Sequence, residues 1–357
     1  MKKVLIVTGG TGGHVIPSIS LFEHLNKKFS VKIVSDIRGS RFIDKNKYNY
    51  ELIDVPNLFS KIYLFPINIF KYVISIFKSI NFIKNKEINL VISTGGYMTF
   101  PLCLAAFFLK KKIFLFEPNS VLGRSNKIAL NFSNKIICYD SNMKNFPKKF
   151  NFKKIVFEPI LRKEIYDIDQ NNRVNIKNKK ILIVGGSQGA LFFDNKIVDI
   201  IVEISKKIKI DVIQQVSNKD SISLIKEKYD QANINYNFFE FSKSSKEIYE
   251  GVDLAITRGG ANTLSELSYL KIPFISVPLP SARDNHQYYN SNYYLKKDYC
   301  WIVQQKDFNT MEVCKLIEDI IVYNKTYIQK NEKLKKITEN NTWNNINSNI
   351  IRIFDEN

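Results

Sequence analysis

The sequence predicts an α/β protein built from two doubly wound domains, and three observations support this fold class. Short β-branched runs alternate with helix-length segments, which is typical of βαβ units and parallel sheets. The alternation pauses at a polar stretch rich in Asn and Lys, residues 167–179, and then restarts. The chain has 357 residues, which is more than one hydrophobic core usually supports.

Continuous apolar runs mark the strands of the two predicted sheets, because a strand covered by helices on both faces is hydrophobic throughout. In the first half these runs occupy residues 4–7, 31–34, 90–93, 113–116 and 135–138. In the second half they occupy residues 181–184, 212–215, 238–241, 254–257, 274–277 and 301–303. Ligands of doubly wound sheets bind at the carboxyl ends of the strands, so two such domains are expected to enclose an interdomain cleft.

The polar stretch, residues 167–179, is taken as the linker between the two βαβ arrays. We expect a first domain over residues 1–160 and a second over residues 161–341. Apolar residues at positions 343, 346, 350 and 354 have helical spacing. They predict a C-terminal helix, residues 342–357, that packs back on the first domain.

Composition restricts the classes of partner and compartment. The chain is 45% hydrophobic and 24% charged, as in soluble globular proteins, and its formal net charge is +19. Most of that charge is Lys in a sequence also rich in Asn and Ile, so it is weak support for a polyanionic partner, although a basic face toward nucleic acid or an anionic membrane stays possible. The four cysteines are far apart in apolar runs, which predicts buried thiols in a reducing compartment. The apolar run that follows Met1 is too short for a signal peptide.

One predicted helix, residues 66–83, is almost wholly apolar or aromatic apart from a stripe of Lys71, Ser75 and Lys78. It has about the length of a membrane span, but two lysines near its middle make spanning costly. Residues 107–112 repeat the aromatic and basic character. The helix therefore either belongs to the core, which periodicity alone favours, or lies on a membrane surface.

Two strand–glycine–helix junctions carry most of the functional signal. The first is the loop 9–14, Gly-Gly-Thr-Gly-Gly-His, and the second is the loop 185–190, Gly-Gly-Ser-Gln-Gly-Ala. Glycines allow backbone N–H groups to approach a phosphate, and the following helix start adds a partial positive charge. The pair predicts two phosphate-bearing ligands, or one diphosphate facing a second substrate.

A nicotinamide-dependent dehydrogenase is a weaker hypothesis, because neither loop fits the dinucleotide-binding fingerprint. In the first loop Val15 stands where the fingerprint has a small residue. The second loop lacks an acidic residue at the end of the next strand, where Gln214 and Gln215 stand instead. Asp36 does end the second strand of the first domain, so the dehydrogenase is demoted and not excluded.

An α/β hydrolase is the sharpest rival from another class. The second loop matches the Gly-x-Ser-x-Gly nucleophile elbow at Ser187, and Asp253 and His286 follow in the required chain order. However, such an elbow explains neither the first glycine loop nor the later Gly259-Gly260 pair.

Two further polar clusters follow predicted strands. Residues 257–266 turn on two glycines and open a helix whose Glu266 could bind the vicinal hydroxyls of a ribose, although helix capping explains this carboxylate equally well. Residues 284–287, Asp-Asn-His-Gln, form a dense group of hydrogen-bond donors and acceptors. Asp167 and Asp169 have the spacing of a metal-binding carboxylate pair, but they lie in the polar stretch, so no metal site is predicted.

Taken in order, six groups of residues resemble one family, the UDP-N-acetylglucosamine:lipid I glycosyltransferases of peptidoglycan synthesis, or MurG family. The groups span nearly the whole chain and are 9–14, 95–97, Glu117 and Asn119 with Gly123 and Asn126, 185–190, 258–266 and 284–287. The resemblance implies a GT-B fold of two Rossmann-like domains, with the acceptor in the first and the donor in the second. It also implies transfer of N-acetylglucosamine from UDP to the 4-hydroxyl of N-acetylmuramoyl-pentapeptide diphosphoundecaprenol (lipid I), with inversion and without a required metal or cofactor, to make lipid II.

The resemblance also assigns roles to residues. The donor-binding positions are Thr11, Gly12, Gly13, Asn119, Asn126, Arg162, Ser187, Gln188, Gly189, Ala261, Asn262, Thr263, Glu266, His286 and Gln287. Among them, Ser187 and the next two amides would hold the diphosphate, Arg162 would lie near the uracil and Glu266 would bind the ribose. His14 and Tyr97 are placed on the acceptor side, and the catalytic candidates are His14 and Glu117.

His14 is the favoured general base, because a histidine with an ordinary pKa of about 6.5 suits proton transfer at neutral pH. The alternative, that His14 binds the acceptor diphosphate or orients its loop, stays open. The implied partners are UDP-N-acetylglucosamine, undecaprenyl-linked lipid I and an anionic membrane surface, with no nucleic acid. The implied location is the cytoplasmic face of the plasma membrane, with the helix 66–83 in the docking face. The nearest alternative enzymes are related glycolipid glycosyltransferases and UDP-N-acetylglucosamine 2-epimerases.

Overall fold

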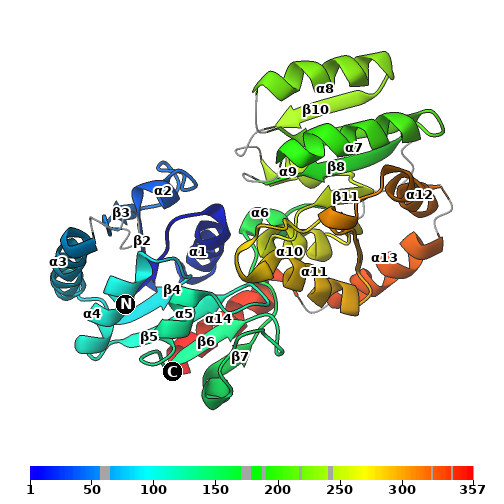
Figure 1. The fold of residues 1–357 in the computed structure, drawn as a ribbon. Helices are drawn as coiled ribbons and strands as arrows, with labels where there is room; N and C mark the ends of the chain where they lie inside the picture. The colour runs from blue at the N-terminus through cyan, green and yellow to red at the C-terminus, as the bar shows by residue number, and fades with distance from the viewer. Residues whose placement is uncertain are drawn as a thin grey trace. The chain divides into compact units, whose positions relative to one another are not determined.

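The chain divides into two compact units, each built around its own parallel sheet (Figure 1). The computed structural model describes residues 1–56, 65–169, 178–186, 190–216, 219–239, 244–322, 325–338 and 341–356. Unit 1 contains Met1–Lys163 and Trp343–Asn357, and unit 2 contains Glu164–Thr342.

The sheet of unit 1 has seven parallel strands among the described residues, in the order β3-β2-β1-β4-β5-β6-β7. They are β1 (Lys3–Val7), β2 (Ser30–Ser35), β3 (Tyr50–Leu52), β4 (Leu90–Ser93), β5 (Lys112–Glu117), β6 (Lys135–Cys138) and β7 (Lys154–Val156). The order reverses between β1 and β4, so the helices that follow these two strands, α1 (Gly12–Leu25) and α4 (Thr99–Phe108), cover opposite faces of the sheet. A crevice for ligands forms at such a switch point.

Alternation of side chains along the strands gives unit 1 a core on each face of its sheet. Val4 and Ile6 belong to one cluster, and their neighbours Leu5 and Val7 belong to the other. Helices cover both faces; they and a short 3₁₀ segment are α1 (Gly12–Leu25), α2 (Ile37–Ser40), α3 (Phe65–Asn85), α4 (Thr99–Phe108), α5 (Arg124–Ala129), η2 (Lys148–Lys153) and α14 (Trp343–Glu356). Helices α1 and α14 supply the first cluster, and α3, α4 and α5 supply the second.

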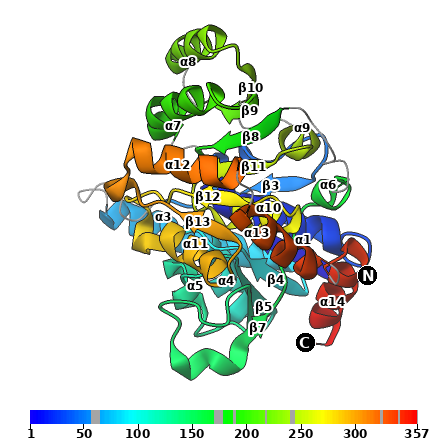
Figure 2. The same ribbon diagram turned by 90° about the vertical axis from the view of Figure 1, so that its right-hand side faces the viewer.

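The C-terminal helix α14 packs on unit 1, beside α1 (Figure 2). Ile346, Ile350 and Phe354 are its buried residues, and they recur at helical spacing. The Phe354 ring meets the Phe114 ring of β5 edge to face, with the ring centres 4.9 Å apart.

The chain passes from unit 1 to unit 2 after Lys163 and returns at Trp343. The residues at both crossings contact the last turns of α1. The fully buried His24 stacks on Trp343, with ring centres 3.9 Å apart, and its Nε2 lies 3.2 Å from the carbonyl oxygen of Leu161. The neighbouring Glu23 accepts the backbone N–H of Lys163 at 2.7 Å. One turn of α1 therefore holds the departing and the returning chain.

The sheet of unit 2 has six parallel strands among the described residues, in the order β10-β9-β8-β11-β12-β13. They are β8 (Lys179–Val184), β9 (Ile210–Gln215), β10 (Asn235–Phe239), β11 (Leu254–Thr257), β12 (Phe274–Ser276) and β13 (Cys300–Ile302). The order matches that of unit 1 up to its last strand, with the switch point between β8 and β11.

Helices cover both faces of this second sheet as well. The helices of unit 2 are α6 (Lys163–Tyr166), α7 (Ala190–Ser205), α8 (Lys219–Gln231), α9 (Ser245–Tyr249), α10 (Ala261–Tyr269), α11 (His286–Lys296), α12 (Thr310–Ile321) and α13 (Lys325–Thr338), with the 3₁₀ segments η3 (Arg283–Asn285) and η4 (Gln305–Asp307). Ile181 and Ile183 of β8 face a core that includes residues of α7, α8 and α12. On the other face, Phe274 of β12 meets Tyr294 of α11 edge to face.

The structure confirms the predicted α/β fold class and corrects three strands. The edge strands β3 and β7 were not predicted, because their residues are half-exposed or exposed and form no apolar run. The strand predicted at residues 238–241 is instead β10, Asn235–Phe239. It begins earlier because Tyr236 and Phe238 both pack against Tyr229, and residues 240–241 lie outside the described residues.

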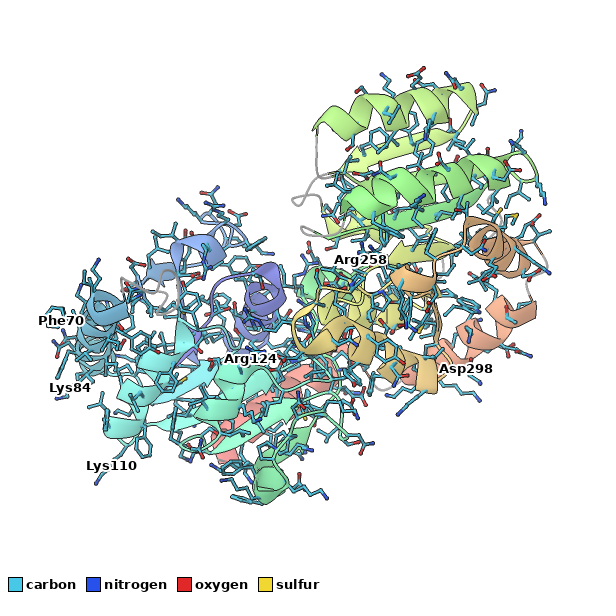
Figure 3. All side chains as sticks on the ribbon, in the orientation of Figure 1. Phe70, Lys84, Lys110, Arg124, Arg258 and Asp298 are labelled. Atoms are coloured by element: carbon cyan, nitrogen blue, oxygen red, sulfur yellow. The ribbon has the colours of Figure 1, made fainter. Side chains whose placement is uncertain are left out.

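Helix α3 is apolar on two sides: Tyr72, Ile80 and Ile83 pack into the second core cluster, while other apolar side chains face outward. Phe70 and Phe77 are 67% and 63% exposed, whereas Ser75 and Ser79 are almost completely buried. Phe70 and Lys84 project outward from this helix, and Lys110 lies at the end of α4 (Figure 3). None of the helices that the structure describes combines the length and apolarity needed to cross a membrane.

Candidate active site

The loops after β1 and β4 meet at the switch point of unit 1. The first contains Gly9 and Gly10, and the second contains Gly95 and Gly96, with φ of +92° and +94°. A Cβ on Gly96 would lie 2.9 Å from the carbonyl oxygen of Gly9, and one on Gly95 would lie 3.1 Å from the His14 ring. These glycines are needed because the two loops are in direct contact and because an L side chain rarely adopts their φ.

His14 lies in the first turn of α1, between these loops. Its Nδ1 is 2.9 Å from the carbonyl oxygen of Thr94, which can only accept a hydrogen bond. Nδ1 therefore carries the proton, and Nε2 is left as the basic nitrogen of the neutral ring. The side chain is half-buried. This arrangement is that of an oriented base, with one nitrogen fixed by the fold.

Glu117 organises the loop between β5 and α5. Its buried carboxylate accepts the side-chain amide of Asn119 at 2.8 Å, the backbone N–H of Gly123 at 2.9 Å and the Nδ2 of Asn126 at 3.0 Å. The Oδ1 of Asn126 is buried and has no partner among the described residues, and Asn126 lies beside Gly95. The structure thus brings His14, Asn126 and Glu117 together, with Glu117 bound to its own loop.

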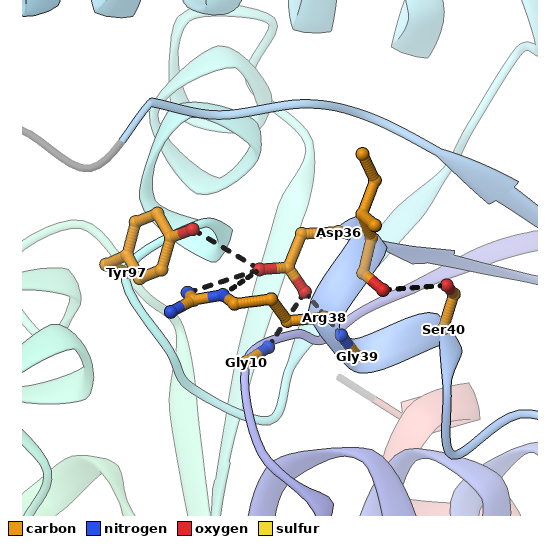
Figure 4. A network of polar contacts seen from close by, with 7 residues as sticks. Gly10, Asp36, Arg38, Gly39, Ser40 and Tyr97 are labelled. Carbon is orange, nitrogen blue, oxygen red and sulfur yellow. Dashed lines mark hydrogen bonds and ion pairs between the residues drawn. The ribbon is translucent and has the colours of Figure 1, made fainter.

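Asp36 directly follows β2 and connects three segments at the same edge of the sheet (Figure 4). Its Oδ1 accepts the backbone N–H groups of Gly10 and Gly39, each at 2.8 Å. Its Oδ2 accepts from the guanidinium of Arg38 and from the hydroxyl of Tyr97, all at 3.3 Å. Both oxygens are occupied, so Asp36 is not free to bind a ribose as in a dinucleotide-binding dehydrogenase.

In unit 2, helix α10 begins at Ala261, directly after Gly259 and Gly260. Ala261, Asn262 and Thr263 are half-exposed in its first turn, whereas Glu266 is buried and accepts the hydroxyl of Tyr249 at 2.7 Å. This hydrogen bond from the far end of α9 fixes the orientation of the carboxylate. Sequence patterns did not identify Tyr249, because its partner lies on a different element.

The Arg-Gly-Gly segment before α10 has a structural explanation. Arg258 is buried, donates to Val277 at 3.0 Å and to Gln305 at 2.8 Å, and burial lowers its pKa to about 10. Gly259 is required because a Cβ would lie 2.1 Å from the carbonyl oxygen of Gln287. The Oε1 of Gln287 accepts the backbone N–H of Gly259 at 3.2 Å and that of Leu279 at 2.9 Å, so this predicted donor-binding residue also holds two loops together.

The loop before α11 contains two adjacent residues, Asp284 and Asn285, with φ of +52° and +53°. Non-glycine residues rarely adopt this conformation, and it is concentrated at functional sites. His286 follows directly, and its Nδ1 donates to the carbonyl oxygen of Arg283 at 2.9 Å. As in His14, the backbone fixes one ring nitrogen and leaves Nε2 as the acceptor.

The remaining predicted donor-binding residues lie in three different parts of the chain. Ser187, Gln188 and Gly189 lie outside the described residues. Thr11, Gly12 and Gly13 form the exposed to half-exposed start of α1. Arg162 is half-buried and belongs to unit 1, because the chain divides after Lys163.

The hydrolase hypothesis is wrong, because its acidic residue lies at the opposite end of the sheet. Asp253 precedes β11 and accepts the backbone N–H of Lys180, near the amino end of β8. The glycine loop with Ser187 follows the carboxyl end of that strand. β8 and β11 run parallel, with Leu254 beside Ile181 and Thr257 beside Val184, so a full strand length separates Asp253 from Gly185, where the elbow sequence begins.

Comparison with known proteins gives the same picture. Residues 4–138 match the glycosyltransferase family 28 N-terminal domain, and residues 180–344 match the family 28 C-terminal domain. The chain is 40% identical over 356 residues to the UDP-N-acetylglucosamine–N-acetylmuramyl-(pentapeptide) pyrophosphoryl-undecaprenol N-acetylglucosamine transferase of Pelagibacter ubique, covering 100% of this chain and 99% of that protein.

Two solved structures show how widely this fold is shared. MurG of Acinetobacter baumannii matches with a TM-score of 0.78 and 22% identity over 99% of this chain and 100% of that one. The UDP-N-acetylglucosamine 2-epimerase of Neisseria meningitidis matches with a TM-score of 0.67 and 14% identity, again over 99% and 100%. The fold alone therefore does not separate transferase from epimerase.

The fold, the paired glycine loops and the two matched domains define a glycosyltransferase of family 28. The 40% identity to the Pelagibacter enzyme, over the full length of this chain, identifies the family within this class. The chain belongs to the MurG family of N-acetylglucosamine transferases.

Proposed function

We propose that the protein transfers N-acetylglucosamine from UDP-N-acetylglucosamine to the 4-hydroxyl of undecaprenyl-linked lipid I, with inversion at the sugar carbon and without a required metal or cofactor. Full-length relatives carry both substrates in their names. The structural observation that carries the proposal is the hydrogen bond from His14 to Thr94, because it leaves a basic nitrogen at the switch point of unit 1.

In this reaction Nε2 of His14 takes the proton of the acceptor hydroxyl. The hydroxyl oxygen forms a bond to the anomeric carbon while the bond from that carbon to the UDP oxygen breaks, so a single displacement inverts the configuration. A well-placed general base contributes about 10²–10⁴-fold to such a step. Glu117 acts here as a positioning residue, because its carboxylate is bound by donors of its own loop.

Asn126 is proposed to contact the transferred sugar. Its Nδ2 is held by Glu117, and its buried Oδ1 lacks a partner among the described residues. An unsatisfied buried acceptor costs about 1–3 kcal/mol, and a sugar hydroxyl would remove that cost. Asn119, donating to the same carboxylate, would support this position.

Unit 2 is proposed to bind the donor, with unit 1 binding the acceptor. Glu266, oriented by Tyr249, would accept the ribose hydroxyls, while His286, Gln287 and the first turn of α10 would surround the sugar. The diphosphate is assigned to Ser187, Gln188 and Gly189 and to the start of α7, where backbone N–H groups and the helix dipole favour negative charge. Thr11, Gly12, Gly13 and Arg162 keep their proposed contacts to the donor.

The exposed side of α3 is proposed to dock on an anionic membrane, at the cytoplasmic face of the plasma membrane. Ile67, Phe70, Ile74 and Phe77 are exposed on this helix, and Phe107 and Phe108 extend the patch onto α4. Lys71, Lys78 and Lys84 are exposed on the same helix, and Lys110 is exposed just after the end of α4. Apolar side chains that enter the interface and lysines that meet anionic headgroups are the two components of interfacial binding.

The proposal is tested with UDP-N-acetylglucosamine and a short-chain lipid I analogue. UDP release that requires the acceptor, with a β-linked disaccharide by NMR, supports an inverting transferase. Unchanged turnover in EDTA supports a reaction without a required metal. Epimerised sugar formed without acceptor would instead identify an epimerase, and transfer only to another glycolipid would identify a related glycosyltransferase.

A further inference from the structure

The guanidinium of Arg38 is fixed beside the first glycine loop. Its Nε and Nη2 each lie 3.3 Å from Oδ2 of Asp36, and its Cζ lies 4.8 Å from the centre of the Tyr97 ring. A Cβ on Gly10 would have Nη2 of Arg38 as its nearest neighbour, at 3.9 Å. A buried carboxylate and an aromatic ring thus hold one cation at the carboxyl edge of the sheet (Figure 4).

This contact is not a fully satisfied ion pair. Charge-assisted N–H···O bonds are usually about 2.7–2.9 Å long, and both bonds to Asp36 are longer than that. Asp36 already receives two backbone N–H groups and the Tyr97 hydroxyl. A guanidinium has five N–H donors. Arg38 makes its bonds to Asp36 through Nε and Nη2, and the side chain remains 53% exposed.

The position of this cation matches the layout of the acceptor. Arg38 follows β2, whereas His14 follows β1 and contacts the loop after β4, so the two groups lie along one edge of three neighbouring strands. In the acceptor, the reacting 4-hydroxyl and the diphosphate stand at opposite ends of one sugar ring. An anion-binding group is therefore expected at some distance from the base, and an arginine suits a phosphate because its planar donors bind bidentately.

We propose that Arg38 binds the diphosphate of the lipid-linked acceptor, and that Asp36 and Tyr97 are positioning residues that orient its guanidinium. The inference rests on the proposed transferase function. Arg38 thereby contributes to acceptor affinity, while donor affinity depends on other residues.

The test compares Arg38→Gln with Arg41→Gln, which removes the same charge from the exposed end of the same short helix. Steady-state kinetics use two acceptors: the short-chain lipid I analogue, and the same compound with its peptide carboxylates converted to amides. Arg38→Gln is expected to raise the acceptor KM about ten-fold or more with both acceptors, with the donor KM unchanged. Arg38→Lys is expected to recover part of the loss, and Arg41→Gln to behave as wild type.

Each other result overturns the inference. An effect that disappears with the amidated acceptor would assign Arg38 to the peptide, and no effect would remove it from the acceptor site. Equal losses in kcat, donor KM and thermal stability would make its role structural. For the positioning residues, Tyr97→Phe is expected to raise the acceptor KM by a few fold at constant kcat. An inactive wild-type protein would instead reject the proposed function itself, so the two failures are distinguishable.

Discussion

His14 and Thr94 are joined by a hydrogen bond of 2.9 Å from the imidazole Nδ1 to a backbone carbonyl oxygen. Because the carbonyl has no proton to give, the bond fixes the ring orientation and the tautomer together. The partner is main chain, so no substitution at position 94 removes it directly. The geometry of His14 therefore depends on the path of the loop after β4, and above all on Gly95.

Removing the imidazole should abolish proton transfer and spare the donor site. We expect His14→Ala to lower kcat by about 10²–10⁴-fold, with the affinity for UDP-N-acetylglucosamine unchanged. Turnover and donor binding by calorimetry measure the two quantities separately. A raised acceptor KM at constant kcat would show that His14 only binds the acceptor.

Gly95→Ala should disturb His14 without touching it covalently. The new Cβ would lie 3.1 Å from the imidazole, at a backbone φ of +92°. Gly251→Ala is the matched control, because that turn residue has φ of +71° in unit 2. Both variants should lose about 1–2 kcal/mol of stability, but only Gly95→Ala should lose turnover. Wild-type kcat in Gly95→Ala would contradict the proposed dependence.

Glu117→Gln should weaken the loop that carries Asn126. A glutamine keeps one acceptor oxygen but places an NH₂ group against N–H donors that now meet a carboxylate. We expect kcat to fall about 10–100-fold together with a lower melting temperature, while Glu87→Gln at an exposed ion pair has little effect. A larger loss than in His14→Ala would instead move the base role to Glu117.

If α3 carries the docking surface, substitutions on it should weaken membrane binding and leave turnover with a soluble acceptor unchanged. Burying each phenylalanine contributes about 1.5–3 kcal/mol, so Phe70→Glu with Phe77→Glu should weaken binding to anionic vesicles about 100-fold or more. Turnover with a soluble acceptor should persist. Leu224→Glu with Ile328→Glu is the control, since these side chains are 54% and 53% exposed in unit 2. Equal loss of vesicle binding in both pairs would reject a specific docking surface.

His24 predicts that the folded state loses stability in acid. It lies on α1 and contacts Leu161 and Trp343, which lie near the two crossings between the units. Burial lowers the pKa of His24 to about 4, although hydrogen bonds to Leu161 and Asn347 and the charge of Glu23 oppose the shift. Its ordinary pKa is about 6.5, so its contribution is fully present above that pH and is lost as the pH falls toward about 4. The loss approaches about 3 kcal/mol, because the unfolded chain binds a proton that the folded chain excludes.

Urea unfolding at pH 7 and pH 5 measures this effect. His24→Phe keeps a ring against Trp343 but cannot titrate, so the wild type should lose about 2 kcal/mol more than the variant between these two pH values. An identical pH dependence in both proteins would show that another group is responsible.

Much of the fold was accessible from local patterns. The central strands were predicted because residues buried on both sheet faces produce apolar runs, as at residues 90–93. The edge strands β3 and β7 gave no such run, since solvent covers part of them. Burial of α3 could not be read from its composition either. Periodicity alone favoured a core helix, and only the packing showed that Phe70 and Phe77 are exposed while Ser75 and Ser79 face inward.

The sequence by itself determined the two βαβ arrays, both glycine loops and the family resemblance, because each depends on residue types at fixed local spacing. Only the tertiary structure decided what the side chains do. It placed Asp253 at the wrong end of the sheet for a hydrolase and occupied both oxygens of Asp36. It also set Arg38 beside Tyr97, a contact between two strand ends that lie far apart in the chain. Such contacts arise from the order in which parallel strands assemble, and no local pattern encodes that order.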